Sequence, residues 1–144
     1  MDSSSKDLKQ VIVVRKDLNM RKGKLAAQVS HGSNMFIEKV LELVFLYQYE
    51  PDKFKKNKEY HEEIIQSYLT WCEEHLYKKV VVGCSSEEEL LELIGHAAKI
   101  GISHFPIYDM GLTEFHGQKT LTCCAFGPSL RYDVDQITGH LKLI

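Results

Sequence analysis

The sequence predicts an α/β fold, because runs with strand character alternate along the chain with segments of helical periodicity. Two valine-rich runs, at residues 10–15 and 79–84, have the composition of largely buried strands. Each is followed by a longer segment of helix-forming residues. Strands that alternate with helices in this way are typical of a sheet covered by helices.

The first half of the chain is predicted to contain one strand and two helices. After the strand at residues 10–15, residues 17–20 are of turn-forming and N-cap types, and residues 22–44 have helical periodicity. The core-facing stripe of this helix consists of Leu25, Val29, Gly32 and Phe36. A proline and several lysines predict a solvated connection at residues 47–58, and helical periodicity resumes at residues 60–76.

The second half is predicted to contain three strands and two helices. Ser85 and Ser86 precede three glutamates, which predicts an N-cap and a helix that ends at Gly101. The other elements are predicted to be strands at residues 79–84, 104–108 and 120–126, the last closed by Gly127 and Pro128, and a helix at residues 133–140.

The size and composition are those of a soluble globular chain. Its 144 residues are expected to form a single domain, residues 1–144, with residues 1–7 as a flexible leader. The hydrophobic content of 44% and the charged content of 26% are ordinary. We expect a cytoplasmic protein, because the leader lacks the apolar core of a signal peptide and no apolar run is long enough to span a membrane.

The four cysteines and seven histidines form no recognisable metal-binding pattern. No two cysteines have CxxC spacing, and no HExxH motif is present. We therefore expect neither a metal nor another cofactor. The reduced, buried thiols are expected to be Cys72, Cys84, Cys123 and Cys124.

A basic segment near the start of the chain stands out against a net charge of −2. The overall charge argues against a protein that binds nucleic acid over its whole surface, but a local cluster of cations predicts contact with an anionic partner. The plainer interpretation is that Lys16 and Lys22 only keep the protein soluble. The cluster consists of Arg15, Lys16, Arg21, Lys22 and Lys24.

Three polar residues follow one face of the first predicted helix. At about 100° per residue, Lys24, Gln28 and His31 form a narrow stripe beside the core-facing one. They are candidates for catalysis; the alternative is a solvated lysine, a surface amide and a structural histidine. An ATP-binding phosphate loop is excluded, because Leu18 and Leu25 stand where that motif needs Gly and Ser or Thr.

A second group of candidates lies around the third and fourth predicted strands. Asp109 and Thr113 follow the third strand, and Thr122 lies in the fourth. Strand ends are where α/β folds commonly place binding sites. The plainer interpretation is that Asp109 begins a tight turn with Gly111 and that Thr122 is an ordinary strand threonine.

Taken together, the motifs that contain these candidates occur in a distinctive order. They are Val-Ile-Val-Val-Arg-Lys-Asp-Leu-Asn-Met at residues 11–20, Gly-Lys-Leu-Ala-Ala-Gln-Val-Ser-His at 23–31, Asp-x-Gly-x-Thr at 109–113, Thr-x-x-Ala-x-Gly-Pro at 122–128, and Ile-Thr-Gly-His-Leu-Lys-Leu at 137–143. Over roughly residues 8–34 and 79–144, the chain resembles the type 2 (archaeal and eukaryotic-type) peptidyl-tRNA hydrolase family.

The chain departs from the family pattern in three places. Residues 35–78 form an enlarged helical segment, Met110 replaces the usual alanine after the aspartate, and the loop from Asp109 to Thr122 is one residue longer. These differences bear on how far the protein reaches along its substrate and on the shape of the loop beside the candidate site.

The resemblance implies a fold, an assembly and an activity. The fold is expected to be a three-layer α/β/α sandwich around a four-stranded mixed sheet of order 2-1-4-3, with strand 4 antiparallel. The chain is expected to form a homodimer. The implied activity is hydrolysis, without a metal, of the ester that joins a peptide to the ribose at the 3′ end of tRNA.

Ester hydrolysis needs a positioned water, a proton acceptor and groups that stabilise the oxyanion. By resemblance, Lys24 is expected to face the oxyanion or a terminal phosphate, and Asp109 to hold the water or orient Lys24. These two side chains must therefore share one cleft. Bonds to water or ribose are expected from Thr113 and Thr122, and His31 is the rival proton acceptor. Substrate binding is assigned to Gln28, Arg15, Lys16, Arg21 and Lys22.

Two other classes of function stay open at this point. A non-catalytic tRNA-binding or protein-binding member of the same fold would use residues 35–78 as its partner surface, although Lys24, Asp109 and Thr113 argue against it. A small-molecule-binding α/β domain without a link to tRNA is favoured only by the acidic net charge.

Overall fold

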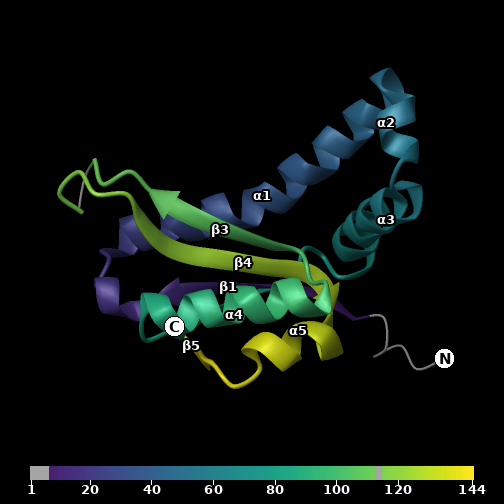
Figure 1. Cartoon of the computed structure of the whole chain (residues 1–144). Helices are drawn as coiled ribbons and strands as arrows, with labels where there is room; N and C mark the ends of the chain where they lie inside the picture. Colours follow the sequence, from purple (N-terminus) through teal and green to yellow (C-terminus); the bar gives the residue numbers. More distant parts are fainter. Residues whose placement is uncertain (1–6, 113–114) are drawn as a thin grey trace.

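A five-stranded mixed sheet lies between two layers of helices (Figure 1). The computed structural model describes residues 7–112 and 115–144, so most of the predicted leader lies outside the described residues. The sheet has the order β3-β4-β1-β2-β5, in which β1 and β2 are parallel, β4 is antiparallel to β1 and β3, and β5 is antiparallel to β2. The strands are β1 (Leu8–Arg15), β2 (Lys79–Cys84), β3 (His104–Asp109), β4 (Thr120–Leu130) and β5 (Lys142–Leu143).

The expected sheet of four strands was wrong by one strand. The additional β5 has only two residues, both exposed, and pairs with Val82 and Gly83 of β2. Two exposed residues give no alternating pattern that could have predicted a strand. The other four strands lie in the order β2-β1-β4-β3, with β4 antiparallel to both of its neighbours.

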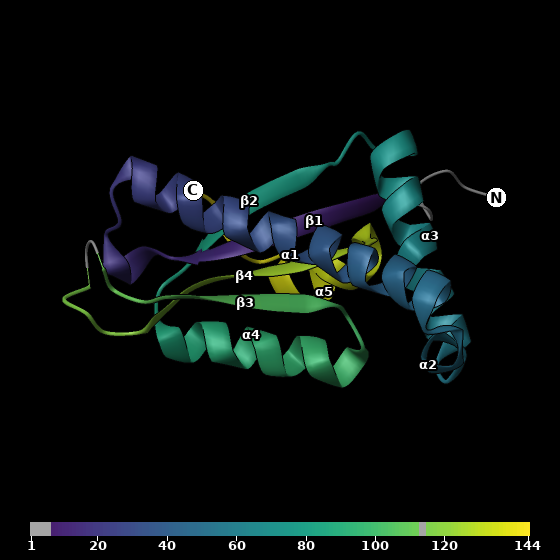
Figure 2. The same ribbon diagram turned by 90° about the horizontal axis from the view of Figure 1, so that it is seen from above.

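The helices cover both faces of the sheet, which gives the three expected layers (Figure 2). On one face, Phe36 of α1 and Trp71 of α3 share a core cluster, and the ring centroids of these two residues are 6.1 Å apart. On the other face, Leu90 of α4 and Val134 of α5 pack with Val13 of β1. The helices are α1 (Lys22–Tyr49), α2 (Pro51–Lys55), α3 (Lys58–Glu74), α4 (Glu87–Ile100) and α5 (Arg131–Thr138).

The predicted core-facing stripe of α1 is confirmed. Gly32 and Phe36 are buried, and Leu25 and Val29 pack against the sheet. A Cβ atom at Gly32 would lie 3.5 Å from the Cβ of Ala125, an ordinary van der Waals contact, so α1 lies directly against β4 at this position. The first turns of α1 are therefore held near the ends of the central strands.

The predicted solvated connection at residues 47–58 is largely helical instead. Helix α1 continues to Tyr49 and projects beyond the sheet, and the short α2 follows at its far end (Figure 1). The reason is Phe54, which has lysines as its neighbours in the sequence. Its side chain is buried and packs against Tyr47 and His61. A single buried aromatic residue fixes this segment, although its composition is that of a loop.

Two smaller predictions also needed correction. Strand β4 does not end before Gly127 and Pro128, because the pairing with β1 shifts register there and resumes at Ser129 and Leu130. Gly127 has a φ of +82°, which suits a glycine in a bulge. All four cysteines are free, but only three are buried, and Cys72 is partly exposed.

The predicted start and end of the helix after β2 are confirmed. The Ser86 hydroxyl accepts a hydrogen bond from the Glu89 backbone at 3.1 Å, and Gly101 ends α4 in the left-handed conformation. None of the helices in the described ranges is both long and apolar enough to cross a membrane.

Candidate functional site

An ion pair joins the first turn of α1 to the end of β3. The Lys24 Nζ donates to Asp109 Oδ2 at 2.6 Å, and only 13% and 14% of the two side chains are exposed. The two groups come from positions 85 residues apart in the sequence. The ammonium group and the carboxylate, which were expected to share one cleft, are thus in direct contact.

Gln28 connects the ion pair to β4. Its Nε2 donates to Asp109 Oδ2 at 3.3 Å, and its Oε1 accepts from the Thr122 hydroxyl at 2.7 Å. The pairing of β3 with β4 shifts register after Ile107, so Thr122 has no partner residue in β3. Its hydroxyl lies within hydrogen-bonding distance of both Gln28 of α1, at 2.7 Å, and the Ile107 carbonyl of β3, at 3.2 Å. Thr122 is fully buried, so it holds the Gln28 amide from the protein interior and is not open to solvent.

The backbone of the β3–β4 connection holds the other oxygen of the carboxylate. Gly111 N donates to Asp109 Oδ1 at 2.8 Å. Gly111 has a φ of +78°, and a Cβ there would lie 2.5 Å from the backbone nitrogen of Gln118, so only glycine fits. This bond is that of an Asx turn, so the turn that the Asp-x-Gly motif predicts also supports the carboxylate.

Hydrogen bonds keep Asp109 ionised. The bond from Lys24 holds the pKa of Asp109 below its ordinary value of 3.8, and the bonds from Gly111 and Gln28 act in the same direction, against the opposing effect of burial. At neutral pH the site therefore contains a carboxylate and an ammonium group in contact. Phe115, which had no signal in the sequence, lies beside them, with its ring centroid 5.7 Å from Lys24 Nζ.

Two predicted catalytic residues are not part of this cluster. His31 is exposed two turns further along α1, and in the described part of the chain it forms no hydrogen bond or ion pair with Lys24 or Asp109. Thr113 lies outside the described residues. The structure thus brings together Lys24, Gln28, Asp109 and Thr122 from the predicted set.

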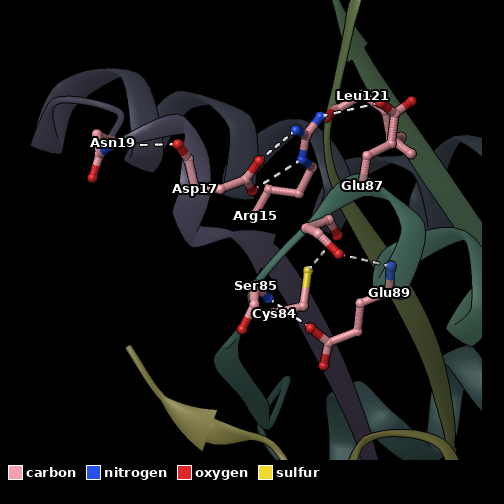
Figure 3. Close-up of polar contacts among 9 residues, drawn as sticks. Arg15, Asp17, Asn19, Cys84, Ser85, Glu87, Glu89 and Leu121 are labelled. Atoms are coloured by element: carbon pink, nitrogen blue, oxygen red, sulfur yellow. Dashed lines mark hydrogen bonds and ion pairs between the residues drawn. The ribbon is translucent and has the colours of Figure 1, made fainter.

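The predicted basic segment divides into a buried and an exposed part. Arg15 is buried, and its guanidinium donates to both carboxylate oxygens of Asp17, at 3.1 and 2.6 Å, and to the Leu121 carbonyl at 3.0 Å (Figure 3). The exposed cations of the segment are Lys16, Arg21 and Lys22. The aliphatic stem of Lys16 lies against Gly83, in space that the Cβ atom of any other residue at position 83 would occupy.

The described side chains offer no obvious metal site. Among residues 7–112 and 115–144, no group of three or more His, Cys, Asp or Glu side chains is arranged to hold a metal ion. The polar groups that meet at the end of β3 are an ammonium, a carboxylate, an amide and a backbone N–H. These groups can orient a water molecule and stabilise a negatively charged oxygen.

Comparison with known proteins agrees with the motifs that carry this site. The family model described as peptidyl-tRNA hydrolase PTH2 matches residues 8–144. A peptidyl-tRNA hydrolase of Thermococcus onnurineus is 42% identical over 136 residues, which cover 94% of this chain and 97% of that protein. The enzyme of the same name from Methanopyrus kandleri is 38% identical over 136 residues, with the same shares covered. The one from Methanothermobacter thermautotrophicus is 36% identical over 137 residues, which cover 95% of this chain and 100% of that protein. The chain therefore belongs to the peptidyl-tRNA hydrolase PTH2 family.

Proposed function

We propose that this protein hydrolyses the ester bond of peptidyl-tRNA and releases the peptide and the tRNA. The observation that carries the proposal is the Lys24–Asp109 ion pair, which unites two of the motifs at one end of the sheet. Family membership names the ester as the substrate. The ion pair provides charged groups at a place where an ester could react.

We assign Lys24 to the oxyanion that forms when water attacks the ester. An ammonium group held in a site with little solvent stabilises such a charge more strongly than it would in water. Asp109 keeps the ammonium in place through the 2.6 Å bond. Its lowered pKa makes it a weak proton acceptor, so we assign it to orienting Lys24 and the attacking water.

We assign supporting roles to the residues around the pair. Thr122 fixes the Gln28 amide so that its NH2 group faces Asp109, which makes both of them positioning residues. Thr113 keeps its predicted role of bonding water or ribose. We give His31 no step in the reaction, because it is exposed and two turns away from Lys24 on α1.

We assign the recognition of tRNA phosphates to the exposed cations Lys16, Arg21 and Lys22. Lys16 and Arg21 lie in the connection between β1 and α1, and Lys22 is the first residue of α1, in the turn that carries Lys24. Arg15 was expected to share this task, but we do not assign it to the phosphates. Its guanidinium is buried and bonded to Asp17 and Leu121.

We also propose that the protein acts as a homodimer in the cytoplasm, where translation supplies its substrate. The support for a dimer is an apolar stripe on the half of α1 that projects beyond the sheet. This stripe consists of Leu41, Val44 and Phe45, all exposed. Contiguous exposed apolar side chains commonly mark protein interfaces, and a dimer buries the same patch of both copies.

Replacement of Lys24 by alanine should lower the kcat for N-acetyl-aminoacyl-tRNA by about a hundredfold or more, the usual cost of removing an oxyanion donor. The measurement is release of labelled N-acetyl-amino acid, with and without a chelator. Lys99→Ala, an exposed change near the end of α4, is the matched control and should keep the wild-type rate. A folded Lys24→Ala protein with normal turnover would remove Lys24 from the reaction.

Binding of tRNA should weaken as salt rises, because each phosphate contact releases counterions. Lys22→Ala should weaken binding and reduce the slope of log K against log salt by about one. The measurement is fluorescence anisotropy with a labelled tRNA at several salt concentrations, and Lys99→Ala again serves as the control. An affinity that does not depend on ionic strength would contradict the assignment of the exposed cations.

The double change Leu41→Glu and Phe45→Glu should convert a dimer to a monomer, because it would place four carboxylates in the interface of two copies. Light scattering gives the mass in solution. Leu76→Glu, at another exposed leucine outside α1, is the control and should leave the dimer intact. A wild-type protein that is monomeric at all concentrations would contradict the proposed dimer.

A further inference from the structure

A cavity of about 610 Å³ adjoins the Lys24–Asp109 site, and the mechanism above does not use it. This volume lies within the range of sites that bind small molecules. Successive strand residues point to opposite faces, so Asp109 belongs to the α1 face of the sheet and Tyr108 to the cavity on the other face. The cavity is lined by Arg15, Glu87, Tyr108, Phe115, Lys119 and Leu121, among others.

Phe115 places the cavity next to the reacting groups. Its ring lines the cavity, and its centroid is also 5.7 Å from Lys24 Nζ. Thr120, another lining residue, is paired with Asp109 across β3 and β4. A group bound in this cavity would therefore be close to an ester held at Lys24.

We propose that the cavity binds the base of the 3′-terminal nucleotide of tRNA, whose ribose carries the ester. This inference rests on the proposed function. The base and the scissile ester are attached to the same ribose, so the base must lie within one nucleotide of Lys24. The cavity that shares Phe115 with Lys24 meets this requirement.

The walls of the cavity suit a base. Tyr108 is 48% exposed, and Lys119 Nζ lies 4.9 Å from the centroid of its ring. Single-stranded nucleic acid is commonly bound by aromatic rings that stack on bases, beside cations that meet the phosphates. Lys119 is exposed and its side chain is flexible, so its ammonium group can move from the Tyr108 ring to a phosphate while a base stacks on the ring.

The polar groups of the cavity are fixed in advance. The Arg15 guanidinium has five N–H groups, and it donates three hydrogen bonds to Asp17 and Leu121 (Figure 3). The Glu87 carboxylate is 3.8 Å from Arg15 Nη1. A held donor beside an acceptor matches the edge of adenine, which carries ring nitrogen acceptors and an amino donor.

The constant part of the substrate fits this cavity better than the variable part. All tRNAs end in the same adenosine, whereas the peptide differs from one substrate to the next. A buried arginine that is locked by three hydrogen bonds suits a group whose shape and donors do not change. The peptide varies in sequence and length, so an open surface would accommodate it better than this cavity.

The test compares two acceptor-stem RNA hairpins that end in CCA, one complete and one with an abasic 3′-terminal nucleotide. Their Kd values are measured for the wild-type protein, Tyr108→Ala, Tyr108→Phe and the control Tyr132→Ala, an exposed change on α5. Removal of the base should weaken binding by the wild-type protein by about fivefold or more. Tyr108→Phe and Tyr132→Ala should show the same loss, and Tyr108→Ala should show little or none.

Equal binding of the two hairpins by the wild-type protein would overturn the inference without reference to any variant. An equal loss in Tyr108→Ala and the wild-type protein would overturn it as well, because the base would then bind elsewhere. The proposed function has its own readout in the cleavage of N-acetyl-aminoacyl-tRNA. If the protein cleaves that ester but binds both hairpins equally, only the cavity assignment fails; if it cleaves no ester, the proposed function fails.

Discussion

The site depends on one contact, the ion pair between Lys24 and Asp109. Two charges that are mostly removed from water are stable together only if their remaining hydrogen-bonding groups also find partners. Asp109 meets this condition, because it accepts bonds from Lys24, from the Gln28 amide and from Gly111 N. The loss of any of these donors would leave the largely buried Asp109 carboxylate with one hydrogen bond fewer and little water to replace it.

The architecture of the sheet explains why this contact can form. Strand β4 lies between β1 and β3 and is antiparallel to both, so β1 and β3 run in the same direction and end at the same edge. That edge is where α/β folds commonly place binding sites. Helix α1 packs against β4 at Gly32, and the irregular pairing at Thr122 brings a strand side chain to Gln28.

Much of this could be predicted from the sequence, because hydrophobic patterns and helix caps are local signals. The stripe from Leu25 to Phe36 and the cap at Ser86 are examples. What could not be predicted depends on partners distant in the chain. Phe54 makes a helix of a lysine-rich segment, and β5 is a strand only because β2 offers an open edge.

The same limit applies to the candidate site. Lys24 and Gln28 were placed on one stripe with His31, but only the position of β3 decides that the first two meet Asp109 and the third is exposed. Arg15 has the charge of a phosphate-binding residue, and its burial beside Asp17 and Leu121 is not visible in composition. The cavity is assembled from three separate segments, so no single motif indicated it.

The most direct test of the central contact is an NMR titration of the Asp109 carboxyl carbon in the wild-type protein and in Lys24→Ala. A carboxylate whose folded pKa is depressed stabilises the fold above its unfolded pKa, and this stabilisation is lost as the pH falls through the folded pKa. We predict that Asp109 titrates below its ordinary pKa of 3.8 in the wild-type protein and that its pKa rises in Lys24→Ala. The same pKa in both proteins, near the ordinary value, would contradict the ion pair and the site built on it.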